Sequence, residues 1–424
     1  MESYNTKQAS ASLNAKLRQL SGAQLESTIY RVHRHLRNVN PTAYEPEMIA
    51  IGPYHHDNEH LKMMEDHKLR YLQQLLVKKS PLDDVGRYVA AIERVEAAAR
   101  KCYADQPKTL TPAQFIQMLV LDGCFIVQLV RKFDRVKCSF NGVNSRETDD
   151  PIFQMDWMIN SLQRDLMLFE NQLPFFVLCE LYDLIEVPGQ HSRFWFLLRQ
   201  FFSIMYPGKG CDPNLPVDPR KVKHLLDFIH RSWLPPLSRQ GERRVMFIDS
   251  ATRLEDANVK FEIRPKGKTL FDVGFEEGVM RMPPLTIEDR TESFLRNLIT
   301  YEQYFQHTFV TDYVHLLDCL IDSSMDVEKL SRKGIINNWL GDAQKVAEMV
   351  NKLGDSVAGP GDGFVYGKMF EDVQKHCAKP MNSWRASLKR KYFNSPWAVI
   401  SLLVGAVLLI LTAVQTVFTI LQVV

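Results

Sequence analysis

Residues 111–130 read TPAQFIQMLVLDGCFIVQLV, a stretch that is apolar on nearly every side when it is wound into a helix. Thr111, Pro112 and Gln114 open it in the order typical of a helix start. The threonine caps the first turn, the proline takes the first helical position and the glutamine completes a capping box. A helix that is apolar nearly all round is usually surrounded by other elements. We therefore expect this helix to lie at the centre of the fold.

The segments around this central helix are also mostly helical in pattern. Before it, a helix is expected from residue 61, with one apolar face made by Leu61, Met64, Leu69, Leu72, Leu75 and Leu76. After it, the helical pattern over residues 156–184 should be kinked or divided by Pro174, and Asp218-Pro219 should start another helix. Further helices are expected over residues 291–320, 326–333 and 342–353.

The periodicity changes between residues 245 and 287. Val259, Phe261 and Ile263 alternate with polar residues, a Pro-Lys-Gly-Lys turn follows, and residues 270–282 are again strand-like. We expect one small antiparallel sheet in this region. The predicted fold class is therefore mainly α, in the α+β sense, with a large helical body and one small sheet.

The end of the chain, residues 397–424, reads WAVISLLVGAVLLILTAVQTVFTILQVV and has no charged residue. About 20 apolar residues suffice to span a bilayer, so residues 397–420 are predicted to form a single transmembrane helix. No other stretch is expected to approach that length. The sequence thus divides into a polar, mobile N-terminal arm over residues 1–28, one large domain over residues 29–391, and the anchor.

The flanking sequence predicts the orientation of this anchor. Lys389, Arg390 and Lys391 precede it, and such positive charges favour the cytoplasmic side. The polar N-terminus contains no signal peptide. We expect a tail-anchored, single-pass protein with a cytosolic body and the lipid bilayer as a partner. The plasma membrane and the endomembranes are not distinguished.

Composition narrows the function classes. The 424 residues carry a formal net charge of +2, so a nucleic-acid partner is not expected. The seven cysteines are scattered without a CxxC pair, which suits reduced thiols rather than a disulfide framework. His56 and His60 have a spacing that could chelate zinc, but no HExxH motif accompanies them, and neither a metal site nor a cofactor is expected.

Several charged residues fall on apolar faces of the expected helices. An unpaired buried carboxylate is costly, so each should meet a cation or backbone donors. The favoured interpretation is a structural polar network, with a catalytic carboxylate pair or a ligand pocket as the alternatives. The candidate residues of this network are Glu65, Lys68, Asp122, Glu170, Glu302 and Arg296.

Six blocks of the sequence resemble, in order and spacing, a plant-specific family known as domain of unknown function 247. They are IYRVHRHLRNVNPTAYEPEMIAIGPYHH, MEDHKLRYL, MLVLDGCFIVQL, DLMLFENQLPFFVLCELY, FDVGFEEGVMRMPPLTIEDRTESFLRNLITYEQ and YFNSPWAVISLL. Two small departures from the family pattern are His33, where proline is usual, and Asn258, where glycine is common. The resemblance implies a plant protein with a C-terminal membrane segment and no established enzymatic activity. Some grass members are implicated in pollen–stigma self-incompatibility.

Two functions of different classes follow. The first is a membrane-anchored, non-enzymatic interaction or signalling protein with an unidentified protein partner. The second is an enzyme at a membrane surface that uses the buried carboxylates on an unrecognised scaffold. A solvent-accessible cleft where two of the four acids converge would favour the enzyme, whereas acids buried one by one against cations would favour the interaction protein.

Overall fold

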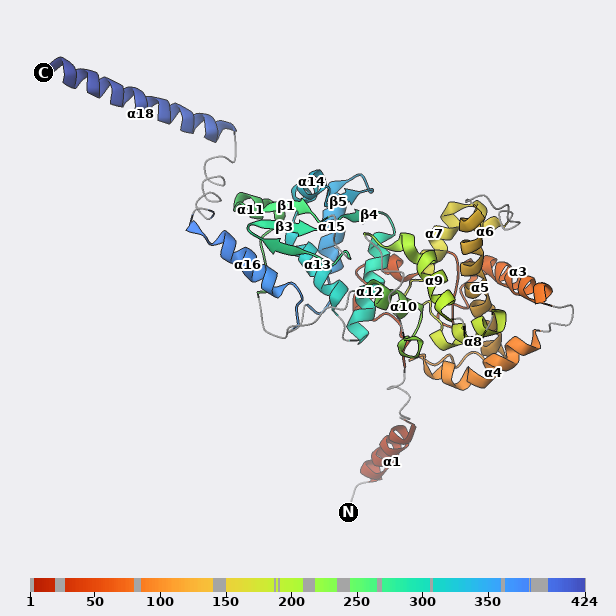
Figure 1. Cartoon of the computed structure of the whole chain (residues 1–424). Helices are drawn as coiled ribbons and strands as arrows, with labels where there is room; N and C mark the ends of the chain where they lie inside the picture. The colour runs from red at the N-terminus through yellow and green to blue at the C-terminus, as the bar shows by residue number, and fades with distance from the viewer. Residues whose placement is uncertain are drawn as a thin grey trace. The chain divides into compact units, whose positions relative to one another are not determined.

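A computed structural model describes residues 4–19, 27–79, 85–139, 150–186, 188–189, 191–208, 218–234, 245–264, 269–305, 308–359, 363–380, 382 and 396–423. Helices predominate among them, and the named strands form two small sheets (Figure 1). The chain divides into two compact units. The first comprises Met1–Leu237, Ile287–Thr311 and Lys352–Gly359, and the second comprises Ser238–Thr286, Asp312–Asn351 and Pro360–Val424.

The first unit is built from helices. They are α1 (Tyr4–Gln19), α2 (Arg34–Arg37), α3 (Met63–Lys79), α4 (Gly86–Lys101), α5 (Pro112–Ser139), α6 (Pro151–Gln154), α7 (Asp156–Asp165), α8 (Phe175–Ile185), α9 (His191–Phe202), α10 (Leu225–Trp233) and α12 (Thr291–Phe305). Short 3-10 turns lie at Pro41–Tyr44, Glu59–Leu61, Ser203–Met205 and Pro219–Lys221. The helix α1 falls within the predicted N-terminal arm, where no helix was expected.

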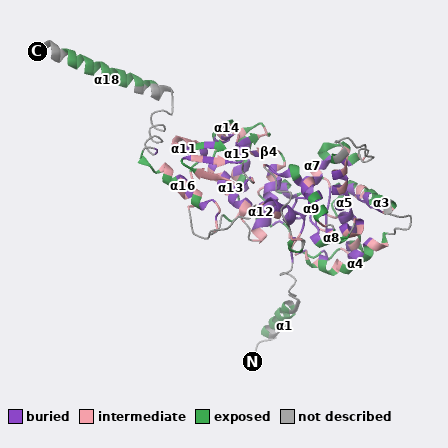
Figure 2. Ribbon diagram, in the orientation of Figure 1, coloured by how far each residue is buried: buried purple, intermediate pink, exposed green. Residues whose placement is uncertain are grey.

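The helix α5 lies at the centre of the first unit, as its sequence predicted. The backbone N–H of Thr111 donates to Gln114 Oε1 at 3.0 Å and the N–H of Gln114 to Thr111 Oγ1 at 3.3 Å, which closes the expected capping box. Helices α3, α4, α8 and α9 pack around α5, whose buried residues are shown in purple (Figure 2). The part Pro112–Lys137 of this helix is long and apolar enough to cross a membrane, but its most apolar stretch is 72% buried within the protein. The expectation that only the C-terminal stretch approaches that length was therefore wrong.

The buried face of α3 differs from the predicted one. Leu69 is 51% exposed, whereas the side chains of Lys68 and Tyr71 are buried beside Met64 and Leu75. These four positions share one side of the helix at spacings of three and four residues, and Leu69 projects from the other side. Hydrophobicity wrongly placed Leu69 inside, whereas Lys68 is buried, as expected of a member of the predicted polar network.

Two other predicted helices are shorter than expected. Nine non-helical residues, 166–174, separate α7 from α8, and Pro174 precedes α8 instead of kinking one continuous helix. Asp218-Pro219 starts only a 3-10 turn, and α10 begins later, with His224 Nδ1 accepting the N–H of Asp227 as its cap. The helical region expected over residues 291–320 consists of the two helices α12 and α13.

The second unit combines strands and helices. Its elements are α11 (Ala251–Asp256), β1 (Lys260–Ile263), β2 (Gly274–Glu276), β3 (Val279–Met282), α14 (Ser324–Arg332), β5 (Ile336–Asn338), α16 (Gly367–Cys377) and α18 (Pro396–Val423), with most of β4 (Leu285–Ile287), α13 (Phe309–Leu320) and α15 (Ala343–Leu353). The predicted helix ends near residues 333 and 353 are confirmed. Gly334, just after α14, has a φ of +72°, a left-handed conformation that glycine adopts without strain.

The three-stranded sheet is mixed, not antiparallel as predicted. Its order is β1-β3-β2, with β1 parallel to β3 and β2 antiparallel to β3. Glu277 and Gly278 both have positive φ in the two-residue turn that joins β2 to β3. The prediction failed because alternation identifies strands but not their order, and here the hairpin places β3 rather than β2 beside β1. A separate pair, β4 and β5, was not expected.

Candidate functional site

Three of the six residues that the sequence singled out, Lys68, Asp122 and Glu170, bond directly to one irregular segment of the first unit, residues 29–54, here called the strap. The strap contains only α2 and one 3-10 turn, so most of its backbone groups have no helical partner. Buried backbone N–H and C=O groups need hydrogen bonds, and in the strap many of these come from side chains of other elements. Several buried charged side chains therefore bond to the backbone of the strap.

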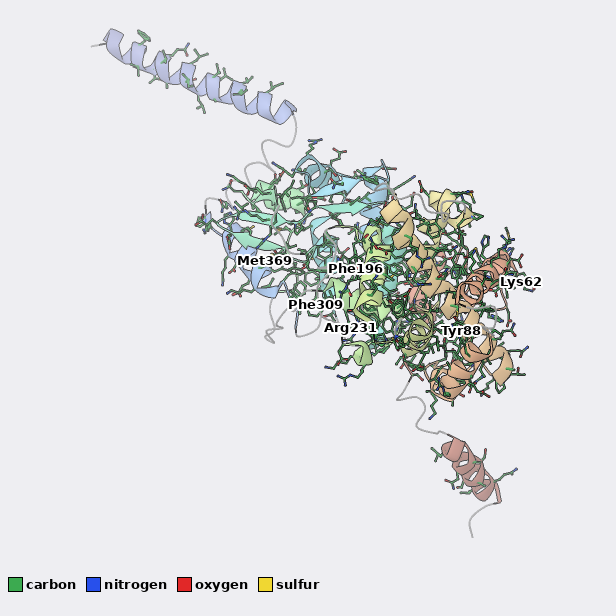
Figure 3. All side chains as sticks on the ribbon, turned by 45° about the vertical axis from the view of Figure 1, so that its right-hand side comes forward. Lys62, Tyr88, Phe196, Arg231, Phe309 and Met369 are labelled. Carbon is green, nitrogen blue, oxygen red and sulfur yellow. The ribbon has the colours of Figure 1, made fainter. Side chains whose placement is uncertain are left out.

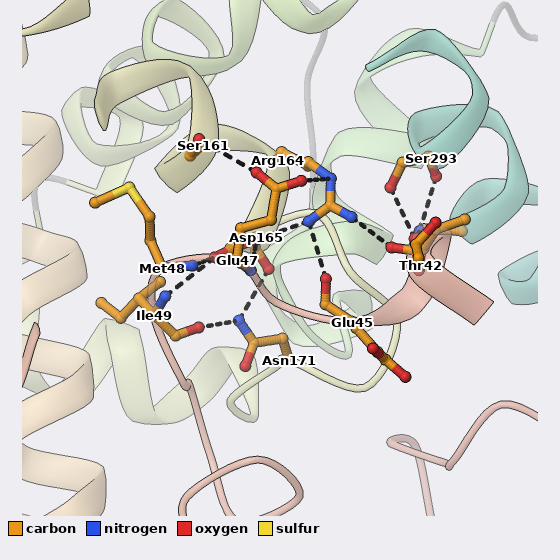
Figure 4. Close-up of polar contacts among 12 residues, drawn as sticks. Thr42, Glu45, Glu47, Met48, Ile49, Ser161, Arg164, Asp165, Asn171 and Ser293 are labelled. Atoms are coloured by element: carbon orange, nitrogen blue, oxygen red, sulfur yellow. Dashed lines mark hydrogen bonds and ion pairs between the residues drawn. The ribbon is translucent and has the colours of Figure 1, made fainter. Parts of the chain in front are cut away.

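Asp165, at the end of α7, holds the middle of the strap. Its carboxylate accepts the backbone N–H groups of Glu47, Met48 and Ile49 at 3.0, 2.7 and 3.0 Å (Figure 4). Burial raises the pKa of Asp165 to about 6, although these three N–H donors and the neighbouring Arg164 favour its charged form. The carboxylate thus accepts the hydrogen bonds that a neighbouring strand would accept in a sheet.

Arg164 binds the strap from the adjacent position. Its guanidinium donates to the carbonyls of Thr42 and Glu45 at 2.7 and 3.0 Å and to the Asp165 carboxylate at 2.9 Å (Figure 4). From α12, Ser293 donates to the next strap carbonyl, that of Ala43, at 2.7 Å. Arg164 and Asp165, adjacent in α7, therefore bond to different backbone groups of the strap. Arg164 donates to its carbonyls, and Asp165 accepts its N–H groups.

The loop between α7 and α8 contains the ENQLPFF motif and binds the next part of the strap. Asn171 accepts the N–H of Ile51 at 2.6 Å and donates to the carbonyl of Ile49 at 2.9 Å. Gly52 approaches this loop closely at a φ of +71°, and a Cβ there would lie 2.6 Å from the carbonyl oxygen of Gln172. Only glycine fits this contact without a shift of the backbone.

Three of the predicted network residues meet at the strap. The Lys68 ammonium donates to Asp122 at 2.6 Å, to Glu65 at 2.5 Å and to the strap carbonyl of Ala50 at 2.7 Å. Burial would lower the pKa of Lys68, but the two carboxylates outweigh it and raise that pKa above its ordinary value. The second oxygen of Asp122 accepts the N–H of Gly52 at 2.8 Å. Glu65, with a side chain 35% exposed, is less buried than predicted.

Glu170 lies apart from this cluster. Its Oε1 accepts the N–H of Val32 at 2.5 Å and contacts the Arg37 guanidinium at 2.6 Å, while His55 Nε2 lies 3.3 Å from Oε2. Burial opposes its ionisation, yet His55, Arg37 and the Val32 N–H together hold the pKa of Glu170 below its usual value. This carboxylate therefore holds the beginning of the strap.

Glu302 and Arg296, both on α12, have separate partners. Glu302 contacts His230 Nε2 at 2.9 Å and accepts the N–H groups of Val310 and Thr311 at 2.9 and 2.8 Å. Arg296 donates to Glu292 at 2.8 Å and, in addition, to the carbonyl of Lys352 at 3.1 Å. The six candidates thus occupy four separate positions, and Lys68 alone joins two of the acids. Within that junction Asp122 is 2% and Lys68 1% exposed, so only the Glu65 side chain reaches the solvent.

Sequence reasoning missed Asp165, Arg164 and Asn171, which make more bonds to the strap than the predicted acids do. Asp165 follows the apolar positions of α7 just as Glu170 follows those of the loop, so the same signal, an acid among apolar residues, could have found it. Nothing local identifies Asn171 as a backbone partner, because its bonds reach residues about 120 positions away.

A polar cavity of about 270 Å³ opens beside the strap in the first unit. Its lining residues are Glu47, Asn160, Ser161, Arg164, Glu288, Asp289 and Arg290. Arg290 is already bound to Glu288 at 2.6 Å and to Asn160 at 3.2 Å. Both lining arginines are therefore committed to internal contacts, and the lining residues include none of the four acids that the sequence singled out. Among the residues that the structure describes, no cluster of three or more metal-binding side chains occurs.

Comparison with known proteins identifies the family of this chain. The model of the family described as plant protein of unknown function, domain of unknown function 247, matches residues 29–411. This chain belongs to that family. It is 31% identical to the UPF0481 protein At3g47200 of Arabidopsis thaliana, over 93% of this chain and 86% of the relative. It is 21% identical to the UPF0481 protein At3g02645 of the same plant, over 95% and 92%. No solved structure matches.

The motifs that resemble the domain of unknown function 247 family can now be located. Three of the quoted blocks supply the strap, the centre of α5 and the ENQLPFF loop, and the strap hydrogen-bonds to the other two in the first unit. The block with IEDRTE supplies cavity residues and the start of α12. Asn258, where the family commonly has glycine, has a φ of +69°, so its backbone adopts the conformation that glycine favours.

Proposed function

We propose that this member of the domain of unknown function 247 family is a membrane-anchored, non-enzymatic interaction protein. The observation that carries the proposal is α18, a helix of 28 residues without a charged side chain. Its side chains from Leu403 to Phe418, a shorter apolar stretch, are all exposed and green in Figure 2. Such a surface is unfavourable in water and suits the hydrocarbon of a bilayer.

The proposal that the body acts by binding rather than by catalysis rests on the carboxylates. Each of the four candidate acids is bound by a cation of the same unit, by backbone N–H groups, or by both. General acid–base catalysis needs a carboxyl that can reach a substrate, and Asp122, Glu170 and Glu302 are buried. The bound partner is proposed to be a protein, with the body on the cytosolic side of the membrane.

The anchor is tested by placing charges in the middle of α18 in the full-length chain. Each aspartate at the centre of a membrane helix costs about 2.5–3.5 kcal/mol, so Ile410→Asp with Val414→Asp should release the protein into the supernatant of carbonate-washed plant membranes. The matched control, Ile410→Leu with Val414→Leu, should remain in the pellet. Equal release of the wild type would refute the anchor.

The orientation is tested with glycosylation acceptors. Val143→Thr turns Asn141-Gly142-Val143 into an acceptor sequence within the body, and a second variant carries an acceptor after Val424. Because the basic residues before α18 should stay in the cytosol, only the acceptor beyond the end of the helix should be glycosylated in plant cells. Glycosylation of the body instead would place the proposed partner outside the cytosol.

A further inference from the structure

The polar cavity beside the strap contains more negative than positive charge. Its charged lining residues are Glu47, Arg164, Glu288, Asp289 and Arg290. Arg164 is also bound, at 2.9 Å, to Asp165, a buried carboxylate that does not line the cavity. Four carboxylates are therefore grouped with two guanidiniums, which leaves a formal charge of −2. The acids of this group exceed the cations available to them.

The two cations are already paired within the first unit. Every nitrogen of the Arg164 and Arg290 guanidiniums lies within 3.3 Å of an acceptor that the fold supplies. One of these acceptors is Glu47, whose second oxygen accepts the hydroxyl of Ser161 at 3.3 Å (Figure 4). An anionic ligand would have to displace these internal acceptors, so the arginines do not make this cavity an anion site.

The carboxylates, in contrast, keep unused capacity to accept hydrogen bonds. An ionised carboxylate has about four acceptor sites on its two oxygens. Within the described part of the chain, Glu288 accepts one side-chain hydrogen bond, from Arg290 at 2.6 Å, whereas the exposed side chain of Asp289 accepts none. What the cavity offers to a ligand is therefore mainly a set of negatively charged acceptors, which suits a cation with several donors.

From this arrangement we propose that the cavity binds the guanidinium of an arginine side chain on the partner protein. The inference rests on the proposed function, in which the body binds a protein. A guanidinium is planar and has five N–H donors, so it can reach several carboxylates at once, whereas an ammonium is a compact point charge. The volume of about 270 Å³ is below the roughly 300–1,000 Å³ of pockets for drug-sized ligands, which suits a single side chain.

The acids on both sides of the cavity are held in place before any ligand arrives. The backbone N–H of Glu47 is bound by Asp165 at 3.0 Å, and the N–H of Glu288 donates to Thr291 Oγ1 at 2.9 Å, at the start of α12. Binding therefore need not order these segments, which lowers its cost. The same negative charge would repel the anionic lipids of a membrane surface, so a protein is the favoured source of the cation.

The inference is tested by titrating the full-length chain in detergent micelles with two capped tripeptides, acetyl-Gly-Arg-Gly-amide and its citrulline counterpart. Citrulline keeps the shape of arginine but carries no charge. Measured by ligand-detected NMR, the arginine peptide should bind saturably, and the citrulline peptide should bind at least about tenfold more weakly. Equal binding of the two peptides would refute recognition of the charge.

A substitution locates the binding. Asp289→Asn should weaken binding of the arginine peptide about three- to tenfold, because it removes the carboxylate that no internal cation engages. The matched control is Asp57→Asn, which removes the same charge from another exposed residue of the first unit, outside the cavity lining, and should leave the affinity unchanged. Equal weakening by the two substitutions would mean that net charge alone attracts the peptide, and the proposed site would be refuted.

A third probe, spermidine, separates a partner's side chain from a free cation. If spermidine binds more tightly than the arginine peptide and Asp289→Asn weakens it, the cavity is a polyamine site and the inference is refuted. Failure of the proposed function gives different results. Extraction of the wild type by carbonate would refute the anchor, and a change in the mass of the incubated peptide would refute the non-enzymatic role, whatever the affinities are.

Discussion

Replacing Lys68 by methionine should destabilise the first unit strongly, because it removes a buried charge while it keeps most of the side-chain volume. The ammonium donates to Asp122, Glu65 and the carbonyl of Ala50, all within 2.7 Å. Without it, the Asp122 carboxylate remains buried without its cation. Removing one partner of a buried ion pair costs about 3–5 kcal/mol. We expect the loss for Lys68→Met to fall in that range.

The control for this substitution is Lys62→Met, just before α3 in the sequence. Lys62 pairs with Glu59 at 2.5 Å, but both side chains are more than half exposed, and Lys62 lies at the edge of the first unit (Figure 3). An exposed pair contributes about 0–1 kcal/mol, so this variant should be nearly neutral. A further variant, Lys68→Met with Asp122→Asn, should regain more than about 1 kcal/mol, because it removes the unpaired charge.

The assay is native-state hydrogen exchange of the amides in α3 and α5, measured on the full-length chain in detergent micelles. This readout reports the opening free energy of the first unit even though a chain with two units need not unfold in one step. The reasoning is refuted if Lys68→Met is no more destabilising than Lys62→Met. It is also refuted if the added Asp122→Asn brings no recovery, since the loss would then come from packing and not from charge.

Two further predictions concern the strap. Glu170→Gln should cost about 1–3 kcal/mol at pH 7, because Arg37 loses its anionic partner. Since the folded-state pKa of Glu170 is lowered, its contribution is present above the unfolded-state pKa and is lost as the pH falls through the folded-state value; denaturant midpoints between pH 7 and pH 3 should therefore converge for the two proteins. Gly52→Ala should be more destabilising than Gly341→Ala by at least about 1 kcal/mol: both glycines have positive φ, but only at Gly52 would an added Cβ lie 2.6 Å from a carbonyl oxygen, that of Gln172. Equal melting temperatures of Gly52→Ala and Gly341→Ala would contradict the prediction for the two glycines.

The parts of the fold that sequence reasoning predicted are those that neighbouring residues determine. Thr111 and Gln114 cap α5 because the donors and acceptors involved lie within three residues. Gly334 follows the end of α14 for the same local reason, its positive φ. The central position of α5 also followed from its own composition, since an apolar helix inside a domain is usually surrounded by other elements.

The parts that could not be predicted depend on residues far apart in the sequence. The order of the strands in the mixed sheet is one case. In the sheet β1 pairs with β3, although β2 lies between them in the sequence. The partners of the acids are another. A carboxylate on an apolar face indicates that some donor must meet it, but Glu170 meets the N–H of Val32, 138 positions away. Periodicity contains no information about such a pairing.

The strap shows what these distant pairings stabilise. Asp122, Asp165 and Asn171 all accept backbone N–H groups of residues 29–54, so their polar atoms are used to fold that segment. A substitution in the ENQLPFF loop should therefore alter biological activity through loss of the folded strap before it affects any binding surface. Stability measured first separates the two effects, because a variant that abolishes partner binding without a loss of stability identifies a residue of the recognition surface. By this reasoning, the exposed lining of the cavity, such as Asp289, is the place to seek such variants, and the buried acids are not.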